Sequence, residues 1–175
     1  CNSGTCIKRF SKIVSWTFDS PSACVISVIN CACMSVGKPG NGSVITSTGT
    51  GPSAATITID GTGDEYAVYI GNSGSAVNSV DGDIIVTGVA QATGDATGIW
   101  IEDGAAVSST GTGGDAASIT LNGTSALSGT YVGNTGTTIT SVAGDIDITG
   151  TGDDKEGVSV RDGAQVTADT GNLTI

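Results

Sequence analysis

The stretch "TGIWIEDGAAVSSTG", from Thr97 to Gly111, contains two short segments in which apolar and polar residues alternate on either side of an Asp-Gly pair. The same pattern occurs earlier in "YAVYIGNSGSAVNSVDG", residues 66–82, and later in "EGVSVRDGAQVTADTG", residues 156–171. Alternation with a period of two predicts a β-strand with one buried face. Glycine beside Asp, Asn or Ser predicts a turn. The sequence therefore predicts a strand–turn–strand unit that is repeated along the chain.

Three kinds of strand recur in a fixed order. The first begins at Val68, Ile99, Thr130 and Val158, so its starts lie 31, 31 and 28 residues apart. The second kind has its central apolar residue at Ile45, Val77, Val107, Ile139 and Val166. The third kind begins at Ile57, Ile84, Ile119, Ile146 and Leu173. Each strand except the last is followed by Gly together with Thr, Asp, Asn or Ser. This includes the first four strands of the third kind, each of which precedes Thr-Gly, Asp-Gly or Asn-Gly. We interpret all of these glycine-containing segments as turns.

A fixed order of three strands predicts a solenoid, because a sandwich has no need to repeat the same signatures in the same order. We expect an all-β fold, a right-handed parallel β-helix with three short strands per coil, about 30 residues per coil and about five coils. Stacked inward columns such as Val68/Ile99/Thr130/Val158 would form its core. Each buried Val or Ile contributes roughly 1.5–3 kcal/mol, so even a glycine-rich chain can fold in this way.

The composition alone resembles that of a disordered linker, with 28 Gly, 4% aromatic and 13% charged residues. The positive mean hydropathy of +0.18 and the regular spacing of Val and Ile argue against disorder. No apolar run reaches the length of a membrane-spanning helix, so we expect no transmembrane segment.

The charge is distributed unevenly. Residues 1–40 hold Lys8, Arg9, Lys12 and Lys38 against Asp19, whereas residues 41–175 hold 16 acids against Lys155 and Arg161. A surface this acidic repels a phosphate backbone, which argues against a nucleic-acid partner. It attracts divalent cations instead, and it keeps an extended assembly in solution.

All five cysteines lie in the first 33 residues, which we interpret as part of an N-terminal cap or irregular first coil (1–35) that precedes the solenoid repeats (36–175). Within the cap, "ISVIN" at residues 26–30 is a candidate third strand. We expect disulfides in the cap, with one cysteine left over and the pairing undetermined. A lipid-modified Cys1 and a sequence that simply begins there are alternatives that both stay open. The candidate disulfide residues are Cys1, Cys6, Cys24, Cys31 and Cys33.

The phrases "GVSVRDGAQVTADTGNLTI" and "GDIDITGTGDD" resemble the repeats of large bacterial secreted proteins of the filamentous-haemagglutinin and autotransporter-passenger type. The resemblance covers about residues 36–175. It implies a right-handed β-helix in a secreted, extracellular or cell-surface protein, such as a filament, an adhesin stalk or a matrix component.

The outward position of the first strand reads Ser35, Tyr69, Trp100, Tyr131 and Ser159 in successive coils, so three adjacent coils carry an aromatic side chain. Tyr69, Trp100 and Tyr131 have three alternative roles: a ladder that stabilises neighbouring strands, a protein–protein contact, or a platform on which sugars stack.

Aspartates recur at the corners of the predicted coils. Calcium binds to carboxylates and turn carbonyls, so these aspartates are candidate calcium ligands, although Asp-Gly and Gly-Asp also favour turns by themselves. The candidates are Asp81, Asp83, Asp145, Asp147 and Asp153. The chain has no His and nothing distinguishes one Asp pair as catalytic, so we expect no enzyme and no required cofactor.

These observations favour a structural extracellular β-solenoid, a subunit or segment of a filament, adhesin stalk or matrix. Its partners are either further copies of itself, assembled head to tail through open solenoid ends, or the surrounding repeats of a longer chain. The alternative is an adhesin module that binds carbohydrate or a cell surface through the outward aromatic residues.

Overall fold

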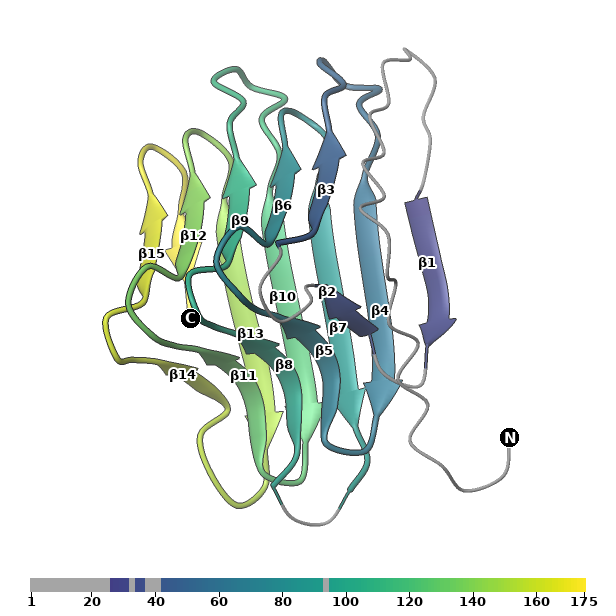
Figure 1. Ribbon diagram of the computed structural model, residues 1–175. Coiled ribbons are helices and arrows are strands. Elements are labelled where there is room, and N and C mark those ends of the chain that lie inside the picture. The colour runs from purple at the N-terminus through teal and green to yellow at the C-terminus, as the bar shows by residue number, and fades with distance from the viewer. Residues whose placement is uncertain (1–25, 32–33, 37–41, 93–94) are drawn as a thin grey trace.

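A computed structural model describes residues 26–31, 34–36, 42–92 and 95–175, with side chains described from residue 42 onward. It is a parallel β-solenoid of about four turns, with three strands per coil and about 30 residues per turn (Figure 1). The predicted fold class is therefore confirmed. The solenoid has about four turns rather than the predicted five, because the outer coils are incomplete: β2 and β14 have three residues each and β16 has two.

The strands form three parallel sheets that are the sides of a prism, and the chain visits them in turn (Figure 1). Sheet I contains β1 (Ile26–Cys31), β4 (Ile57–Gly63), β7 (Ile84–Ala90), β10 (Ile119–Ser125), β13 (Ile146–Gly152) and β16 (Leu173–Thr174). Sheet II contains β2 (Met34–Val36), β5 (Tyr66–Ile70), β8 (Thr97–Ile101), β11 (Ser128–Val132) and β14 (Val158–Val160). Sheet III contains β3 (Val44–Ser47), β6 (Ala76–Ser79), β9 (Ala106–Ser109), β12 (Thr138–Ser141) and β15 (Gln165–Ala168).

The core consists of columns of apolar side chains that run across the coils. Val68 pairs with Ile99, Ile99 with Thr130 and Thr130 with Val158, as the sequence predicts. The one polar member of this column, Thr130, is fully buried, and its hydroxyl donates to the Thr149 carbonyl at 2.8 Å. That hydrogen bond offsets the cost of burying a hydroxyl in an apolar core.

The interpretation of four glycines as turn residues is wrong. Gly61, Gly88, Gly123 and Gly150 lie inside the seven-residue strands of sheet I, where they pair with one another in a single column. A Cβ on any of them would overlap a carbonyl oxygen in a sheet II strand of the same coil or, for Gly150, that of Gly157 just before strand β14. These glycines are therefore required because two backbones approach each other closely where sheets I and II meet.

A full repeat unit of the solenoid contains two coils. The segment "ITIDGTGDEYAVYIGNSGSAVNSVDGDIIVTG" beginning at Ile57 corresponds to "ITLNGTSALSGTYVGNTGTTITSVAGDIDITG" beginning at Ile119, two coils later. The corners alternate in length accordingly. Residues 48–56 and 110–118 make long connections from sheet III to sheet I, and residues 80–83 and 142–145 make short ones. The last such corner, residues 169–172, is short and ends the alternation.

Strand β1 pairs in parallel with β4, so the segment that contains "ISVIN" is an edge strand of sheet I. Residues 1–25 and 32–33 of the predicted cap, and with them Cys1, Cys6, Cys24 and Cys33, lie outside the described residues, as does the side chain of Cys31. Within the part of the chain that the structure describes, no helix is long and apolar enough to cross a membrane.

Candidate functional site

Sheet II carries a row of aromatic side chains on its outer face. Tyr69 pairs with Trp100 and Trp100 with Tyr131, so the three aromatic residues predicted to stack occupy one register position in β5, β8 and β11. The rings of Trp100 and Tyr131 have centroids 4.2 Å apart and an interplanar angle of 34°. A fourth ring, Tyr66 from the start of β5, meets Trp100 edge-on at 5.0 Å and Tyr69 at 6.0 Å. We call these four residues the aromatic ladder.

Tyr66 was not predicted as part of this row, because it lies outside the outward position that repeats from coil to coil. Tyr66 pairs with Thr97 and Thr97 with Ser128, so Tyr66 is the one aromatic residue in that column. Its position three residues before Tyr69, at the opposite end of the same short strand, is the signal that could have identified it.

Tyr69 and Tyr131, which lie on either side of Trp100 in the row, each pack against the glycine two residues further along the chain. A Cβ at Gly71 would overlap the Tyr69 ring, and a Cβ at Gly133 would overlap the Tyr131 ring. Tyr131, which also lies between Trp100 and the Arg161 guanidinium, is only 6% exposed, whereas Tyr69 and Trp100 are partly exposed. The ladder therefore combines a well-covered ring with rings that reach the surface.

The sharp corner after sheet II supplies the polar partners of the ladder. At the same place in four successive coils, Asn or Asp adopts a positive φ, which these two residues tolerate better than most others. The residues and their φ values are Asn72 (75°), Asp103 (56°), Asn134 (71°) and Asp162 (57°). This turn explains why a Gly with positive φ recurs one or two residues after the Asn or Asp, and it places carboxylates beside the tyrosine hydroxyls.

The hydroxyls of Tyr69 and Tyr131 each donate to a carboxylate of the next coil. Tyr69 Oη lies 3.1 Å from Glu102 Oε1, and Tyr131 Oη lies 3.5 Å from Asp162 Oδ2. Burial, followed by the negative charge of Glu102, raises the pKa of Tyr69 well above its ordinary value of 10.0. Burial and then Glu65 raise the pKa of Tyr66 in the same direction.

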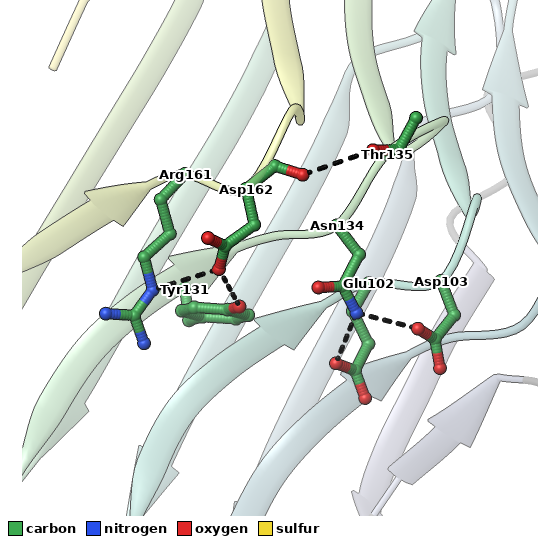
Figure 2. A network of polar contacts seen from close by, with 7 residues as sticks. All are labelled: Glu102, Asp103, Tyr131, Asn134, Thr135, Arg161 and Asp162. Carbon is green, nitrogen blue, oxygen red and sulfur yellow. Dashed lines mark hydrogen bonds and ion pairs between the residues drawn. The ribbon is translucent and has the colours of Figure 1, made fainter.

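Figure 2 shows how the polar groups connect neighbouring coils. Asn134 Nδ2 donates to Glu102 Oε2 at 3.3 Å and to Asp103 Oδ1 at 2.7 Å, so two carboxylates converge on one donor. At the other end of the network, Arg161 Nε lies 3.6 Å from Asp162 Oδ2, and the guanidinium sits 4.9 Å from the centroid of the Tyr131 ring. A cation and an aromatic face are thus in contact at this end of the ladder.

Three of the five candidate calcium ligands bind the backbone of a neighbouring coil. Asp81 Oδ2 accepts from Gly51 N at 2.7 Å, and Asp145 Oδ1 accepts from Asn172 N at 2.7 Å. Asp83 Oδ1 accepts from the backbone N and the hydroxyl of Ser118 at 3.0 and 2.8 Å. The remaining two, Asp147 and Asp153, are exposed. Among the described residues, no three His, Cys, Asp or Glu side chains are grouped so that they could hold a metal ion.

The arrangement as a whole offers aromatic surface, carboxylates and hydrogen-bond donors on one side of a rigid prism, which is the chemistry of a binding or packing face. Comparisons with family models, with curated proteins and with solved structures found no match to this chain, so the proposals below rest on its own sequence and geometry.

Proposed function

We propose that this chain is a structural segment of an extracellular β-solenoid, a filament, adhesin stalk or matrix component, in which coils stack end to end. The observation that carries the proposal is the incomplete burial of the last coil. Val160 is 37% exposed and Leu173 is 44% exposed, whereas Val132 and Ile146, their register partners one coil earlier, are 0% and 1% exposed. A further coil in the same register, from this chain's continuation or from another molecule, would bury these side chains.

The edges of the sheets support the same proposal. The outermost strands β14, β15 and β16 each have a row of backbone N–H and C=O groups that face away from the preceding coil. Such edges pair readily with another strand. The strands of sheet I pair in parallel and in continuous register from β4 through β7 and β10 to β13, so an added coil would meet the geometry that the inner coils already have there.

The test is end-to-end association as a function of concentration, measured by multi-angle light scattering and electron microscopy. We expect rods that lengthen with concentration. The double variant Val160→Lys/Leu173→Lys should stay monomeric, because end-to-end stacking would bury its two lysine charges. A globular monomer at every concentration, with and without calcium, would contradict the proposal.

The alternative function, an adhesin module that binds carbohydrate or a cell surface, is favoured by one observation: Tyr69 and Trp100 are partly exposed on an outer face. Their contacts with other rings favour the stabilising role instead. Glycan-array binding that disappears in Trp100→Ala would support the adhesin module.

A further inference from the structure

Strands β4, β7, β10 and β13 of sheet I lie side by side and form a broad outer face of the prism (Figure 1). Each of them has seven residues, whereas the strands of sheets II and III have five or fewer. Their outward residues are exposed or partly exposed and alternate with the residues that point into the core. Because the four strands pair in continuous register, the outward residues form straight columns across the coils. We call this surface the sheet I face.

The centre of the sheet I face is apolar. Ile85 and Val89 in β7 are each 36% exposed, and the other exposed large hydrophobic residues of the described chain all belong to the last coil. The strands on either side of β7 place threonines beside them, Thr58 and Thr62 in β4 and Thr120 and Thr124 in β10. Methyl groups therefore cover much of the centre, with hydroxyl groups around them, as in an interface that has an apolar core and a polar rim.

The sheet I face also carries little charge, although the chain as a whole has a net charge of −11. Its carboxylates are those of Asp60 in β4 and Asp147 in β13, and these four strands contain no Lys or Arg. Of the outward side chains of these strands, Thr149 is the one that makes a hydrogen bond, 3.4 Å to the Leu121 carbonyl. The remaining polar groups are available to a partner, and like-charge repulsion opposes the approach of a second copy less at this face than at the acidic corners.

We propose that the sheet I faces of two copies of this chain pack against each other, with the two prisms running in opposite directions. A two-fold axis that lies between the faces and parallel to the strands places β7 opposite β10 of the second copy, and β4 opposite β13. Ile85 then contacts Thr120 of the second copy, and Val89 contacts Thr124 of the second copy. The same contacts occur twice, so the interface is isologous and closes as a dimer.

The positions of the carboxylates select this orientation. If the two-fold axis ran along the prism instead, each strand would face its own counterpart, and Asp60 would face Asp60 of the second copy. Such a like-charge pair opposes association. In the proposed orientation, Asp60 faces Thr149 of the second copy and Asp147 faces Thr58 of the second copy, so each carboxylate meets a hydroxyl-bearing residue.

The size of the sheet I face indicates a weak, reversible pair. With about 3.3 Å per residue and about 4.8 Å between strands, the four strands cover roughly 23 by 19 Å, or about 900 Å² on the two copies together. Interfaces of this size belong to transient complexes. The outer face of sheet III is uncharged too, but its strands have four residues and its outward residues include the small Ala76 and Ala106. The lateral pairing does not depend on the end-to-end stacking proposed above, although stacked molecules would pair more tightly through multivalency.

The experiment is sedimentation equilibrium of the whole chain with Val160→Lys/Leu173→Lys, which prevents end-to-end stacking and so isolates the lateral contact. The protein is studied above the concentrations of the rod experiment, up to about 1 mM, and we expect a monomer–dimer equilibrium with a Kd on the order of 100 µM. A monomer throughout this range would leave the face to solvent or to a different molecule and would overturn the proposal.

Two further variants of this protein have the same added charge on different faces. Ile85→Asp/Val89→Asp places carboxylates in the apolar centre and should weaken pairing at least about tenfold. Thr46→Asp/Thr140→Asp adds the same charge to the outer face of sheet III and should change the Kd by less than about threefold. An equal loss in both variants would show that pairing does not use the sheet I face and would overturn the proposal.

Two lysine variants test the orientation. Thr149→Lys places an ammonium group opposite Asp60 of the second copy and should strengthen pairing about threefold or more. Thr120→Lys makes the same change in charge but places it against Ile85 of the second copy, and it should weaken pairing. Circular dichroism checks that each variant is folded, and if Ile85→Asp/Val89→Asp does not fold, the two lysine variants decide. Equal effects of the two lysines, or weaker pairing with Thr149→Lys, would overturn the proposed orientation and with it the proposal.

Discussion

Two groups of glycines in this chain experience opposite constraints. Gly61, Gly88, Gly123 and Gly150 lie where a sheet I strand passes so close to sheet II that any Cβ would overlap a carbonyl oxygen. Gly113 and Gly114, in the long corner between β9 and β10, are exposed and have no heavy atom within 4 Å of the place of a Cβ. In the first group glycine is a packing requirement, and in the second it is one residue among several that a surface loop accepts.

A linker-like composition can therefore conceal a closely packed protein. In this prism, small residues allow backbone to approach backbone at one edge, and apolar columns fill the space inside. The stability of the coils therefore depends on positions at which the side chain is absent as much as on positions at which it is large.

The largest effect is expected for Gly123→Val. The new side chain would overlap the carbonyl of Gly129 and the hydroxyl of Thr130, and neither can move without displacing a sheet II strand. We expect the free energy of unfolding to fall by about 4 kcal/mol, measured by urea denaturation followed by circular dichroism. A loss below about 1 kcal/mol would show that sheets I and II can separate at this edge and that the glycine column is not required.

Two isoleucines of sheet I compare its inner and outer faces in the same way. Ile119 is fully buried, and Ile119→Ala should cost about 3 kcal/mol through lost burial and the cavity that remains. Ile85 points outward from the neighbouring strand and is 36% exposed, so Ile85→Ala should cost less than about 1 kcal/mol. Similar losses for both variants in the same denaturation experiment would indicate that the outer face of sheet I is covered in solution.

An intermediate effect is expected at the corner between sheets III and I. Asp83→Ala removes the carboxylate that accepts from the backbone and the hydroxyl of Ser118 in the next coil. Because the site is exposed, water can replace part of the lost bonding, and we expect a loss of about 1 kcal/mol. Asp115→Ala in the adjacent protruding loop, which makes no such contact with a neighbouring coil in the described structure, is the matched control and should be nearly neutral.

A smaller effect appears only at alkaline pH. The pKa of Tyr69 is raised in the folded state, first by burial and then by Glu102, so above pH 10 the unfolded chain loses this proton before the folded chain does. Stability should therefore fall as the pH rises through 10 and beyond, and Tyr69→Phe should reduce this dependence. Absorbance titration of tyrosinate in the folded protein, with Tyr69→Phe as reference, measures the delayed ionisation directly; an identical alkaline dependence in both proteins would contradict it.

The smallest effect is expected for Gly113→Ala. A methyl group at this position meets open space, and replacing glycine lowers the entropy of the unfolded chain. We expect a change within about 0.5 kcal/mol, with a slight gain in stability as the favoured sign. A clear destabilisation would show that the loop packs against something, and it would remove the contrast between the two groups of glycines.

Periodicity was enough to predict the solenoid, its three sheets and the register of its inner columns, because inward residues such as Val68 and Ile99 repeat their chemical type at each coil. It was not enough for the glycines within strands, since Asp60-Gly61 reads as a turn unless one knows that another backbone passes beside it. The row of Tyr69, Trp100 and Tyr131 was also predictable. The acidic and basic partners of the row could not be predicted, because they come from a turn of the neighbouring coil. The residue type there also differs between corresponding coils, with Glu102 in one and Arg161 in the other.

Because successive coils alternate in corner length and in outward residues, the solenoid is expected to lengthen or shorten by two coils at a time. Removing or duplicating one coil would place like coils against each other, with long corner on long corner and, on the outer face of sheet II, Tyr69 directly beside Tyr131. Removing or duplicating two coils preserves every neighbour relation. Genetic duplication and protein engineering are thus both expected to succeed in units that correspond to the segment from Ile57 to Ser118, so that the length of the prism is effectively counted in pairs of coils.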